Sequence, residues 1–277
     1  MKTICIMNLK GSVGKTVTAG NMAAILAADH GRRVLLIDAD HQGNTSRFFL
    51  REDEISSTLR DILTEDAEPY WPENVYHTGY EGLDIIPADM ALAELDAAPE
   101  RDPCAVWRLR DFLAVIAEDD AYDYVLIDMP PAFSLAARAA LAAADEVIVP
   151  IKLDAFSVYG MAELIRQIAA MRKVNSGLTL AGVLVTMWHN IDIVTQAERV
   201  LRSGSFPVFR TVIRRTDRVD ESTFQRQPLV AYSPRSAACV DYRALVREYL
   251  GRAKPVRKAP TEPRKHLERE AEHGQEV

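Results

Sequence analysis

Short apolar runs alternate with longer stretches in which apolar residues recur every three or four positions. The runs predict strands, and the stretches predict amphipathic helices. Because strands alternate with helices of this length, the pattern indicates an α/β fold: a mostly parallel, twisted sheet with helices on both faces. The predicted strands are Thr3–Met7, Val34–Ile37, Leu83–Ile86, Tyr124–Ile127, Val147–Pro150 and Leu180–Thr186, and the predicted helices are Thr16–Ala28, Val106–Ala117, Ser134–Ala143, Ser157–Val174 and Ser236–Leu250.

The alternation of strands and helices stops near residue 251. We therefore expect one domain over residues 1–251, a length that suits a single large α/β domain. Residues 252–277 carry prolines among mixed charges and almost no large apolar side chains, so a disordered, charged C-terminal tail is expected there. Within the domain, the segment Glu65–Gly82 contains two prolines and an internal glycine and predicts a surface excursion.

Composition narrows the class of protein. Apolar residues make up 48% of the chain, yet no apolar run approaches the roughly 20 residues that span a bilayer, so we expect no membrane association. The three cysteines have no CxxC spacing and the N-terminus has no signal-peptide pattern, which predicts a cytoplasmic protein without disulfides or zinc. The net charge of −7 argues against a wholly basic nucleic-acid binder but leaves room for a local basic patch.

The strongest local signal is a glycine-containing loop between the first predicted strand and the first predicted helix. Gly11 and Gly14 allow a tight turn and a close approach of the backbone to phosphate, and the new helix directs its free N–H groups at an anion. Lys15 is expected to reach the β- and γ-phosphates of a nucleotide, and the Thr16 hydroxyl is expected to bind Mg²⁺. The residues predicted to bind the nucleotide are Lys10, Gly11, Ser12, Val13, Gly14, Lys15, Thr16 and Val17.

Aspartates follow two of the predicted strands. Asp38 and Asp40 come at the end of the second strand, and Asp128 ends the continuously apolar run that begins at Tyr124. Because ligands bind at the carboxyl edge of a parallel sheet, these carboxylates are expected near the loop. A carboxylate delivered by a rigid apolar strand holds Mg²⁺ in P-loop enzymes, which favours Asp128 as a metal group. Without any relative, the Asp38–Asp40 pair fits a loop or a helix cap equally well.

Three motifs together resemble those of the ParA/MinD family of ATPases, and most closely those of its ParA (Soj-like) branch. Leu9 stands where an ordinary phosphate loop has glycine, and Lys10 follows it, which resembles the family's deviant Walker A box. Residues 38–44 look like its D-x-D-x-Q-x-N box, and residues 128–131 look like its D-x-P-P box. A late T-x-I-P-R-x-x-R-x-x-E stretch is matched with Arg214 in place of the proline, so the resemblance covers roughly residues 1–250.

The resemblance implies a P-loop NTPase fold and a switch that hydrolyses ATP slowly, with Mg²⁺, under stimulation by a partner. It implies that Lys10, for which the sequence shows no task within its own subunit, reaches the other subunit's nucleotide in an ATP-dependent homodimer. It implies that Asp40 orients the attacking water and that Lys10 and Lys15 assist catalysis. Family members usually have glycine at the position of Ser12, whose side chain is either accommodated in the closed dimer or weakens it. The implied metal residues are Thr16, Asp38 and Asp128, which hold Mg²⁺ largely through water.

The resemblance also implies a biological role. ParA-type members bind DNA without sequence preference and act with a ParB-like centromere-binding protein to partition a plasmid, a mobile element or a chromosome. A nucleoid-associated protein is therefore expected. The alternatives that the sequence leaves open are a MinD-like or other cargo-positioning ATPase and an ATP-controlled transcriptional regulator.

Charge is unevenly distributed along the chain. Between Arg199 and Arg226, seven arginines stand against three carboxylates, which gives a local charge of +4 in a chain whose total is −7. Arginine suits bidentate contact with phosphate, so we expect this stretch to contact DNA. The alternative is a solvated face with internal ion pairs. The residues predicted to contact DNA are Arg202, Arg215 and Arg218.

Three weaker signals are open to other interpretations. Residues 151–154 resemble the guanine-reading motif of related GTPases, but the first position differs, so ATP is the preferred nucleotide. Trp188 and His189 follow a strand and either line a base pocket or pack at a sheet edge. His41 lies beside the carboxylates without a second histidine at metal-binding spacing, so no transition-metal site is expected.

Overall fold

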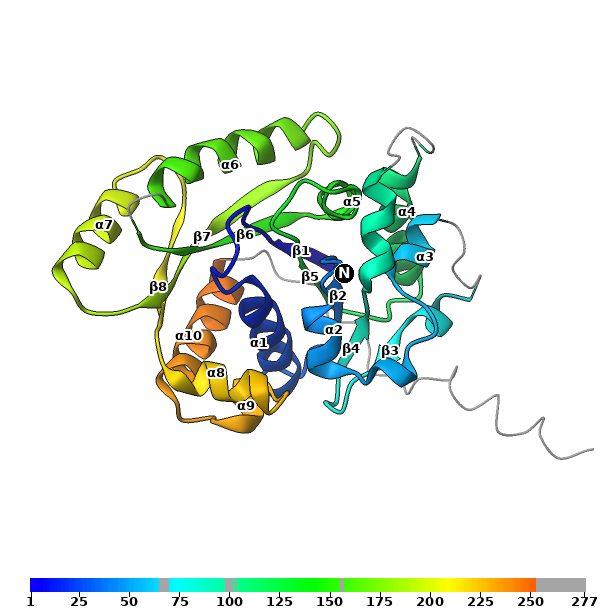
Figure 1. The fold of residues 1–277 in the computed structure, drawn as a ribbon, viewed down its shortest axis with the longest axis horizontal. Helices are drawn as coiled ribbons and strands as arrows, with labels where there is room; N and C mark the ends of the chain where they lie inside the picture. Colours follow the sequence, from blue (N-terminus) through cyan, green and yellow to red (C-terminus); the bar gives the residue numbers. More distant parts are fainter. Residues whose placement is uncertain (65–69, 98–101, 103, 155–156, 253–277) are drawn as a thin grey trace, which may run out of the picture.

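The computed structural model describes residues 1–64, 70–97, 102, 104–154 and 157–252, and an eight-stranded sheet lies at the centre of this part of the chain (Figure 1). The strand order is β3-β4-β2-β5-β1-β6-β7-β8, and neighbouring strands are parallel except for β3 and β4. The mostly parallel sheet predicted from the sequence is confirmed. The strands are β1 (Lys2–Ile6), β2 (Val34–Asp38), β3 (Tyr76–His77), β4 (Leu83–Ile86), β5 (Tyr124–Asp128), β6 (Glu146–Lys152), β7 (Thr179–Trp188) and β8 (Val208–Arg214).

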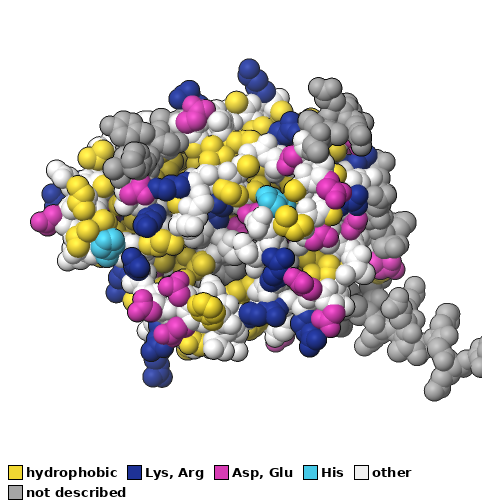
Figure 2. All heavy atoms as spheres, in the orientation of Figure 1, with side chains coloured by type: hydrophobic (Ala, Val, Ile, Leu, Met, Phe, Trp, Pro, Cys, Tyr) yellow, Lys and Arg dark blue, Asp and Glu magenta, His cyan; other side chains and the backbone are white. Residues whose placement is uncertain are grey.

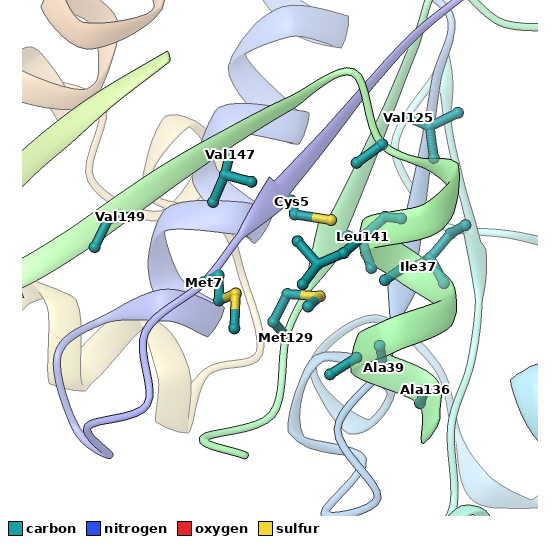
Figure 3. Packing of buried hydrophobic residues seen from close by; sticks show 14 of the residues in the cluster. Cys5, Met7, Ile37, Ala39, Val125, Met129, Ala136, Leu141, Val147 and Val149 are labelled. Atoms are coloured by element: carbon teal, nitrogen blue, oxygen red, sulfur yellow. The ribbon is translucent and has the colours of Figure 1, made fainter. Parts of the chain in front are cut away.

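Alternate side chains of the central strands divide the core into two layers. On β1, Cys5 packs in one layer, whereas Ile4 and Ile6 pack in the other, because successive strand residues point to opposite faces. Both layers are completely buried along β1, which explains why the central strands read as continuous apolar runs. Figure 3 shows the layer of Cys5, where Leu141 of helix α5 (Leu135–Ala143) packs among side chains from the strands.

Helices cover both faces of the sheet (Figure 1). The layer of Ile4 is closed by α1 (Lys15–Ala28) and α10 (Ala237–Arg252). The layer of Cys5 is closed by α4 (Ala105–Glu118), α5 and α6 (Ser157–Met171). The remaining helices are α2 (Asn44–Phe49), α3 (Leu59–Thr64), α7 (Asp192–Arg202), α8 (Asp217–Phe224) and α9 (Leu229–Tyr232), with 3₁₀ turns at Glu52–Glu54, Trp71–Asn74 and Met90–Ala97.

The structure contains each predicted strand and helix, with small differences at the ends. The sequence does not predict β8, an edge strand whose exposed Arg210 and Arg214 interrupt the apolar pattern. It does not predict α2 and α3 either, since their six residues each are too few to show a helical period. Strand β3 and helices α7, α8 and α9 are likewise absent from the prediction.

The predicted surface excursion at Glu65–Gly82 needs correction. Its first part, residues 65–69, lies outside the described residues, but the rest is attached to the domain. Strand β3 adds an antiparallel edge to β4, and Asn74 is fully buried, where it accepts a hydrogen bond from the Ser57 hydroxyl at 2.9 Å.

Two further expectations concern the tail and the membrane. The tail expected over residues 252–277 lies outside the described residues, apart from Arg252, which ends α10. Among the helices that the structure describes, none is both long enough and apolar enough to cross a bilayer.

Candidate functional site

The carboxyl ends of three adjacent strands meet at the centre of the sheet. Strand β5 lies between β2 and β1, so that Asp128 is level with Asp38 on one side and with Ile6 on the other. The loop after β1, the aspartates after β2 and the aspartate at the end of β5 therefore share one edge of the sheet. The structure thus brings the predicted phosphate loop and the predicted carboxylates together.

The loop after β1 turns sharply into α1. Gly14, with a φ of 84°, immediately precedes the helix, and this left-handed backbone favours glycine. Ser12 has a φ of 58°, a conformation that costs a residue with a Cβ about 1–2 kcal/mol. Within the described part of the chain, no side chain caps the N-terminus of α1 and its first turn holds no acidic residue. The first N–H groups of the helix are therefore left for an anion.

Two buried hydrogen bonds fix the loop to neighbouring strands. The side-chain amide of Asn8 donates to the carbonyl of Pro150 on β6 at 2.7 Å. The hydroxyl of Thr186 on β7 donates to the carbonyl of Val13 at 2.8 Å. Both ends of the loop are thereby held to the sheet, which pre-organises its backbone for a ligand.

Lys15 places a buried ammonium group inside the loop. The residue is 7% exposed, and its Nζ donates to the carbonyl of Lys10 at 3.2 Å. Burial lowers the pKa of Lys15, and the negative charges of Asp128 and Asp40 oppose this shift. A desolvated cation surrounded by backbone N–H groups attracts an anion more strongly than the same cation in water does.

Asp128 is buried and receives two hydroxyl groups on a single oxygen. The Thr16 hydroxyl donates to its Oδ2 at 2.7 Å, and the Thr45 hydroxyl donates to the same atom at 2.6 Å. Its other oxygen, Oδ1, is buried without a hydrogen-bond partner among the described residues. Since an unpaired buried carboxylate oxygen is costly, Oδ1 indicates a ligand that is not part of the chain.

Asp38 lies beside Asp128 and is fully buried. Its Oδ2 accepts hydrogen bonds from the backbone N–H and the hydroxyl of Ser46, both at 2.8 Å, and its Oδ1 accepts from the backbone N–H of Asp40 at 3.1 Å. Burial raises the pKa of Asp38 to about 7, and the charge of Asp128 adds to this shift. Burial also raises the pKa of Asp128 to about 6. The two carboxylates oppose each other's ionisation, so a nearby divalent cation stabilises both in their charged forms.

These groups fit Mg²⁺ and a nucleotide phosphate. Mg²⁺ prefers oxygen ligands and keeps several waters, so it needs few protein groups. The Thr16 hydroxyl and Oδ1 of Asp128 are suitable oxygen donors, while Lys15 and the N-terminus of α1 suit the phosphates. The described residues contain no cluster of three or more His, Cys, Asp or Glu side chains that could hold a metal ion without other ligands.

Asp40 lies in a turn just beyond β2. The strand ends at Asp38, and the backbone turns where the N–H of Gly43 donates to the carbonyl of Asp40 at 2.8 Å. The Asp40 carboxylate accepts from the N–H of Gln42 at 3.0 Å, and its charge acts on Lys15 and Asp128. Its side chain is 14% exposed, so that it lies near the other charged groups and remains within reach of water.

The side chain of Lys10 has a partner within its own subunit, contrary to the sequence-based expectation. Its ammonium forms an ion pair with Asp154, just beyond β6. The two side chains are 41% and 34% exposed, and pairs at such exposure contribute only about 0.2–1 kcal/mol. Asp154 belongs to the stretch that resembles a guanine-reading motif, and the ion pair gives its carboxylate a different task.

The arginines predicted to contact DNA differ in how they are held. Arg202 donates to Glu198 at 2.8 Å and to two backbone carbonyls, and Arg218 donates to Glu221 at 2.5 Å. The exposed Arg215 has no side-chain hydrogen bond or ion pair within the described residues. Over α8 and α9, Figure 2 shows basic side chains interspersed with acidic ones. Two more arginines of this stretch are also engaged, Arg214 with Asp241 and Arg226 with the carbonyl of Leu50.

Several contacts of the site are not predicted from the sequence. The hydroxyls of Thr45 and Ser46 directly follow the acidic box, and this position is the signal from which they could have been found. Asp154 is 144 residues from Lys10 along the chain, so no local pattern reports their contact. Trp188 donates to Glu198 of α7 at 2.8 Å, which supports the packing interpretation of this side chain.

Known proteins resemble the chain over most of its length. A family model described as AAA domain matches residues 1–180. The sporulation initiation inhibitor protein Soj of Bacillus subtilis is 35% identical over 254 residues, which cover 89% of this chain and 97% of Soj. The chromosome partitioning protein ParA of Caulobacter vibrioides is 36% identical over 256 residues, which cover 91% of this chain and 95% of that protein. The crystal structure of cobyrinic acid a,c-diamide synthase from Mycobacterium smegmatis with bound ADP and magnesium matches with a TM-score of 0.77 and 26% identity, over 94% of this chain and all of that one.

Proposed function

The chain belongs to the ParA/MinD family of P-loop ATPases, and from this membership we propose that it is a DNA-partitioning ATPase switched by nucleotide. It binds ATP with Mg²⁺, dimerises in the ATP-bound form and binds DNA without sequence preference. With a ParB-like partner that stimulates slow hydrolysis, it partitions a plasmid, a mobile element or a chromosome on the nucleoid. Sequence relatives named for chromosome partitioning support this role.

One observation carries the proposal. At one edge of the sheet lie Lys15, the N–H groups of α1 and Oδ1 of Asp128, the last two without a side-chain partner among the described residues, and together they match the triphosphate and its cation. When bound, Mg²⁺ neutralises phosphate charge and polarises the bond to be broken. Thr16 and Asp128 hold the cation, Asp38 supports them through the network of Ser46, and Asp40 orients the attacking water. The phosphate loop, residues 10–17, cradles the nucleotide.

The second part of the proposal concerns dimerisation. A lysine that leaves Asp154 becomes available to the nucleotide of a second subunit, so the ion pair and the ATP-bound dimer compete for Lys10. The nucleotide then shifts a monomer–dimer equilibrium through its different affinity for the two states. Ser12 already occupies the left-handed conformation that glycine has most easily, so its side chain is accommodated in the single subunit.

We expect an Asp40→Ala protein, which retains ATP, to be dimeric with ATP and monomeric with ADP by light scattering. Adding Lys10→Ala should keep it monomeric with both nucleotides, because no ammonium then reaches across to the other subunit's nucleotide. Adding Asp154→Asn to Asp40→Ala should instead lower the dissociation constant of the ATP-bound dimer about 1.5- to 5-fold. Lys10 then no longer has to leave an exposed ion pair, which contributes about 0.2–1 kcal/mol. Asp53→Asn, which removes an exposed carboxylate that pairs with Arg51, is the control. A size that does not depend on the nucleotide would exclude the switch.

DNA binding is expected to require ATP, since two linked copies of a weak phosphate-binding surface gain affinity by avidity. Arg215→Ala should weaken binding equally on unrelated duplexes and lower the salt slope by about 0.9 for each phosphate that the variant no longer neutralises. Arg218→Ala should act in the same direction, whereas Arg202→Ala should have a smaller effect, since Glu198 and two carbonyls already hold that guanidinium.

Fluorescence anisotropy on two unrelated duplexes at several salt concentrations measures these effects. Arg110→Ala, on α4, removes an exposed arginine from another part of the surface and should leave binding unchanged. An ATP-bound dimer that ignores DNA at low salt would contradict the partitioning role. That result would favour a cargo-positioning ATPase of the MinD kind. It would also exclude the alternative that the protein is an ATP-controlled transcriptional regulator.

A further inference from the structure

Two adjacent hydroxyl groups at the start of α2 contact the two buried carboxylates of the site. The Thr45 hydroxyl donates to Oδ2 of Asp128 at 2.6 Å, and the Ser46 hydroxyl donates to Oδ2 of Asp38 at 2.8 Å. Thr45 is 1% exposed and Ser46 is 2% exposed, so neither hydroxyl can exchange its partner for bulk water. Neither residue belongs to the phosphate loop or to the acidic boxes.

The position of α2 is fixed by close packing rather than by helix propensity. Gly43, with a φ of 62°, precedes the helix, and a Cβ at this residue would lie 2.9 Å from the carbonyl oxygen of Ala88. The backbone N–H of Ala88 in turn donates to the hydroxyl oxygen of Ser46 at 2.8 Å. Because the segment after β4 holds the helix at its first turn, the Thr45 and Ser46 side chains are directed at the carboxylates.

Asp128 accepts hydrogen bonds from two threonine hydroxyls that belong to different parts of the site. Thr16 belongs to the phosphate loop, and its oxygen is also the expected ligand of the cation. Thr45 lies outside the phosphate loop, and its hydroxyl holds Oδ2 from the side of α2. With Oδ2 held by both hydroxyls, the carboxylate presents Oδ1 as the oxygen without a partner among the described residues.

We propose that Thr45 is a positioning residue for the metal carboxylate: its hydroxyl holds Asp128 in the orientation that leaves Oδ1 for Mg²⁺, and it thereby ties α2 to the metal site. The proposal rests on the proposed function, since it presupposes a nucleotide bound with Mg²⁺. Thr45 contacts neither nucleotide nor cation and acts through Asp128. Ser46 fixes the neighbouring Asp38 and anchors the same turn of helix to Ala88.

The hydrogen bond between Thr45 and Asp128 also connects Asp128 to the turn that carries Asp40. Residues 40–43 connect β2 to α2, so the turn is held at one end by the strand and at the other by the helix. The Thr45–Asp128 hydrogen bond therefore connects the carboxylate that would hold the cation to the helix that follows the Asp40 turn.

The test separates binding that depends on Mg²⁺ from binding that does not. The affinity of a fluorescent ATP analogue is measured with Mg²⁺ and with EDTA for wild type, Thr45→Val and Thr45→Ser. In Thr45→Val, the gain in affinity from Mg²⁺ should fall about tenfold, the typical effect of losing one hydrogen bond to a charged group. Affinity in EDTA should be unchanged, and Thr45→Ser should restore the gain, because serine supplies the same hydroxyl.

The matched control is Thr18→Val on α1, which removes a buried threonine hydroxyl whose hydrogen-bond partner is the Tyr242 hydroxyl, 3.1 Å away, rather than a carboxylate. It should leave the Mg²⁺ gain intact. Thr45→Ala, which avoids any crowding by valine, repeats the test if Thr45→Val melts below the assay temperature. An unchanged Mg²⁺ gain in the Thr45 variants, or an equal loss with Mg²⁺ and EDTA, would overturn the positioning role. A wild-type protein without any gain from Mg²⁺ would instead overturn the proposed function.

Discussion

Replacing Lys15 with alanine is expected to weaken nucleotide binding by about 30-fold to several thousand-fold. Lys15 is 7% exposed, and it lies at the start of α1 among backbone N–H groups that have no other anion to bind within the described part of the chain. Truncating a buried charge that faces another charge is costly because the partner is left unpaired. Here the unpaired group would be the phosphate chain.

Calorimetric titration with ATP and Mg²⁺ measures the effect of Lys15→Ala directly. The matched control is Lys2→Ala, which removes a lysine that pairs with Glu146 at 3.0 Å at the opposite edge of the same sheet. This control should bind ATP like the wild type. If Lys15→Ala folds and binds ATP with unchanged affinity, the phosphates do not lie in this loop, and the assignment of the site is wrong.

The site could be predicted from the sequence because each of its parts lies at the end of a central strand. Strands β1, β2 and β5 are buried on both faces, and such strands leave continuous apolar runs that can be read without a structure. Asp38 and Asp128 end two of these runs, so parallel pairing alone brings them side by side. The local geometry needed for the phosphate loop is also encoded locally, by Gly14.

What the sequence does not show depends on contacts between distant residues. The hydroxyl of Thr45 matters because α2 packs against the segment that contains Ala88, and neither fact leaves a periodic pattern. The Lys10–Asp154 ion pair joins the loop after β1 to the segment just beyond β6, which are far apart along the chain. Arg202, at the end of α7, is likewise engaged by Glu198 and by the carbonyls of Phe209 and Arg210 on β8, and no local pattern in the sequence distinguishes it from the exposed Arg215.

The electrostatics of the candidate site connect these parts. Two neighbouring carboxylates are held in a buried position where burial raises the pKa of both. The hydrogen bonds from Thr45, Thr16 and Ser46 work in the opposite direction and favour the charged forms. A cation adds to that stabilisation, so the site is pre-organised to receive a positive charge.

Replacing Asp40 with alanine is expected to preserve ATP binding and to reduce turnover by about 100-fold or more, since positioned acid–base groups contribute about 10²- to 10⁴-fold. Its carboxylate accepts one backbone hydrogen bond in a turn and influences Lys15 and Asp128 only through its charge. Removing it therefore leaves the loop, the lysine and the metal carboxylate in place. Phosphate release under single-turnover conditions, together with calorimetric titration, separates the two effects.

The comparison of three variants identifies what Asp40 contributes. Asp40→Asn keeps an acceptor for the N–H of Gln42 but loses the charge, so it should be as slow as Asp40→Ala if the charge orients the water. Asp89→Ala is the matched control, because Asp89 is an exposed carboxylate that accepts a hydrogen bond from the N–H of Ala91 at 3.0 Å in the same kind of turn. It should hydrolyse ATP at the wild-type rate. If Asp40→Asn hydrolyses ATP normally and Asp40→Ala does not, the residue acts by shaping the turn. If Asp40→Ala itself hydrolyses ATP normally, another group positions the water. The expected result is that both Asp40 variants are slow and the Asp89 variant is normal, because the negative charge at position 40, which also acts on Lys15, is lost in both Asp40 variants and retained in the control.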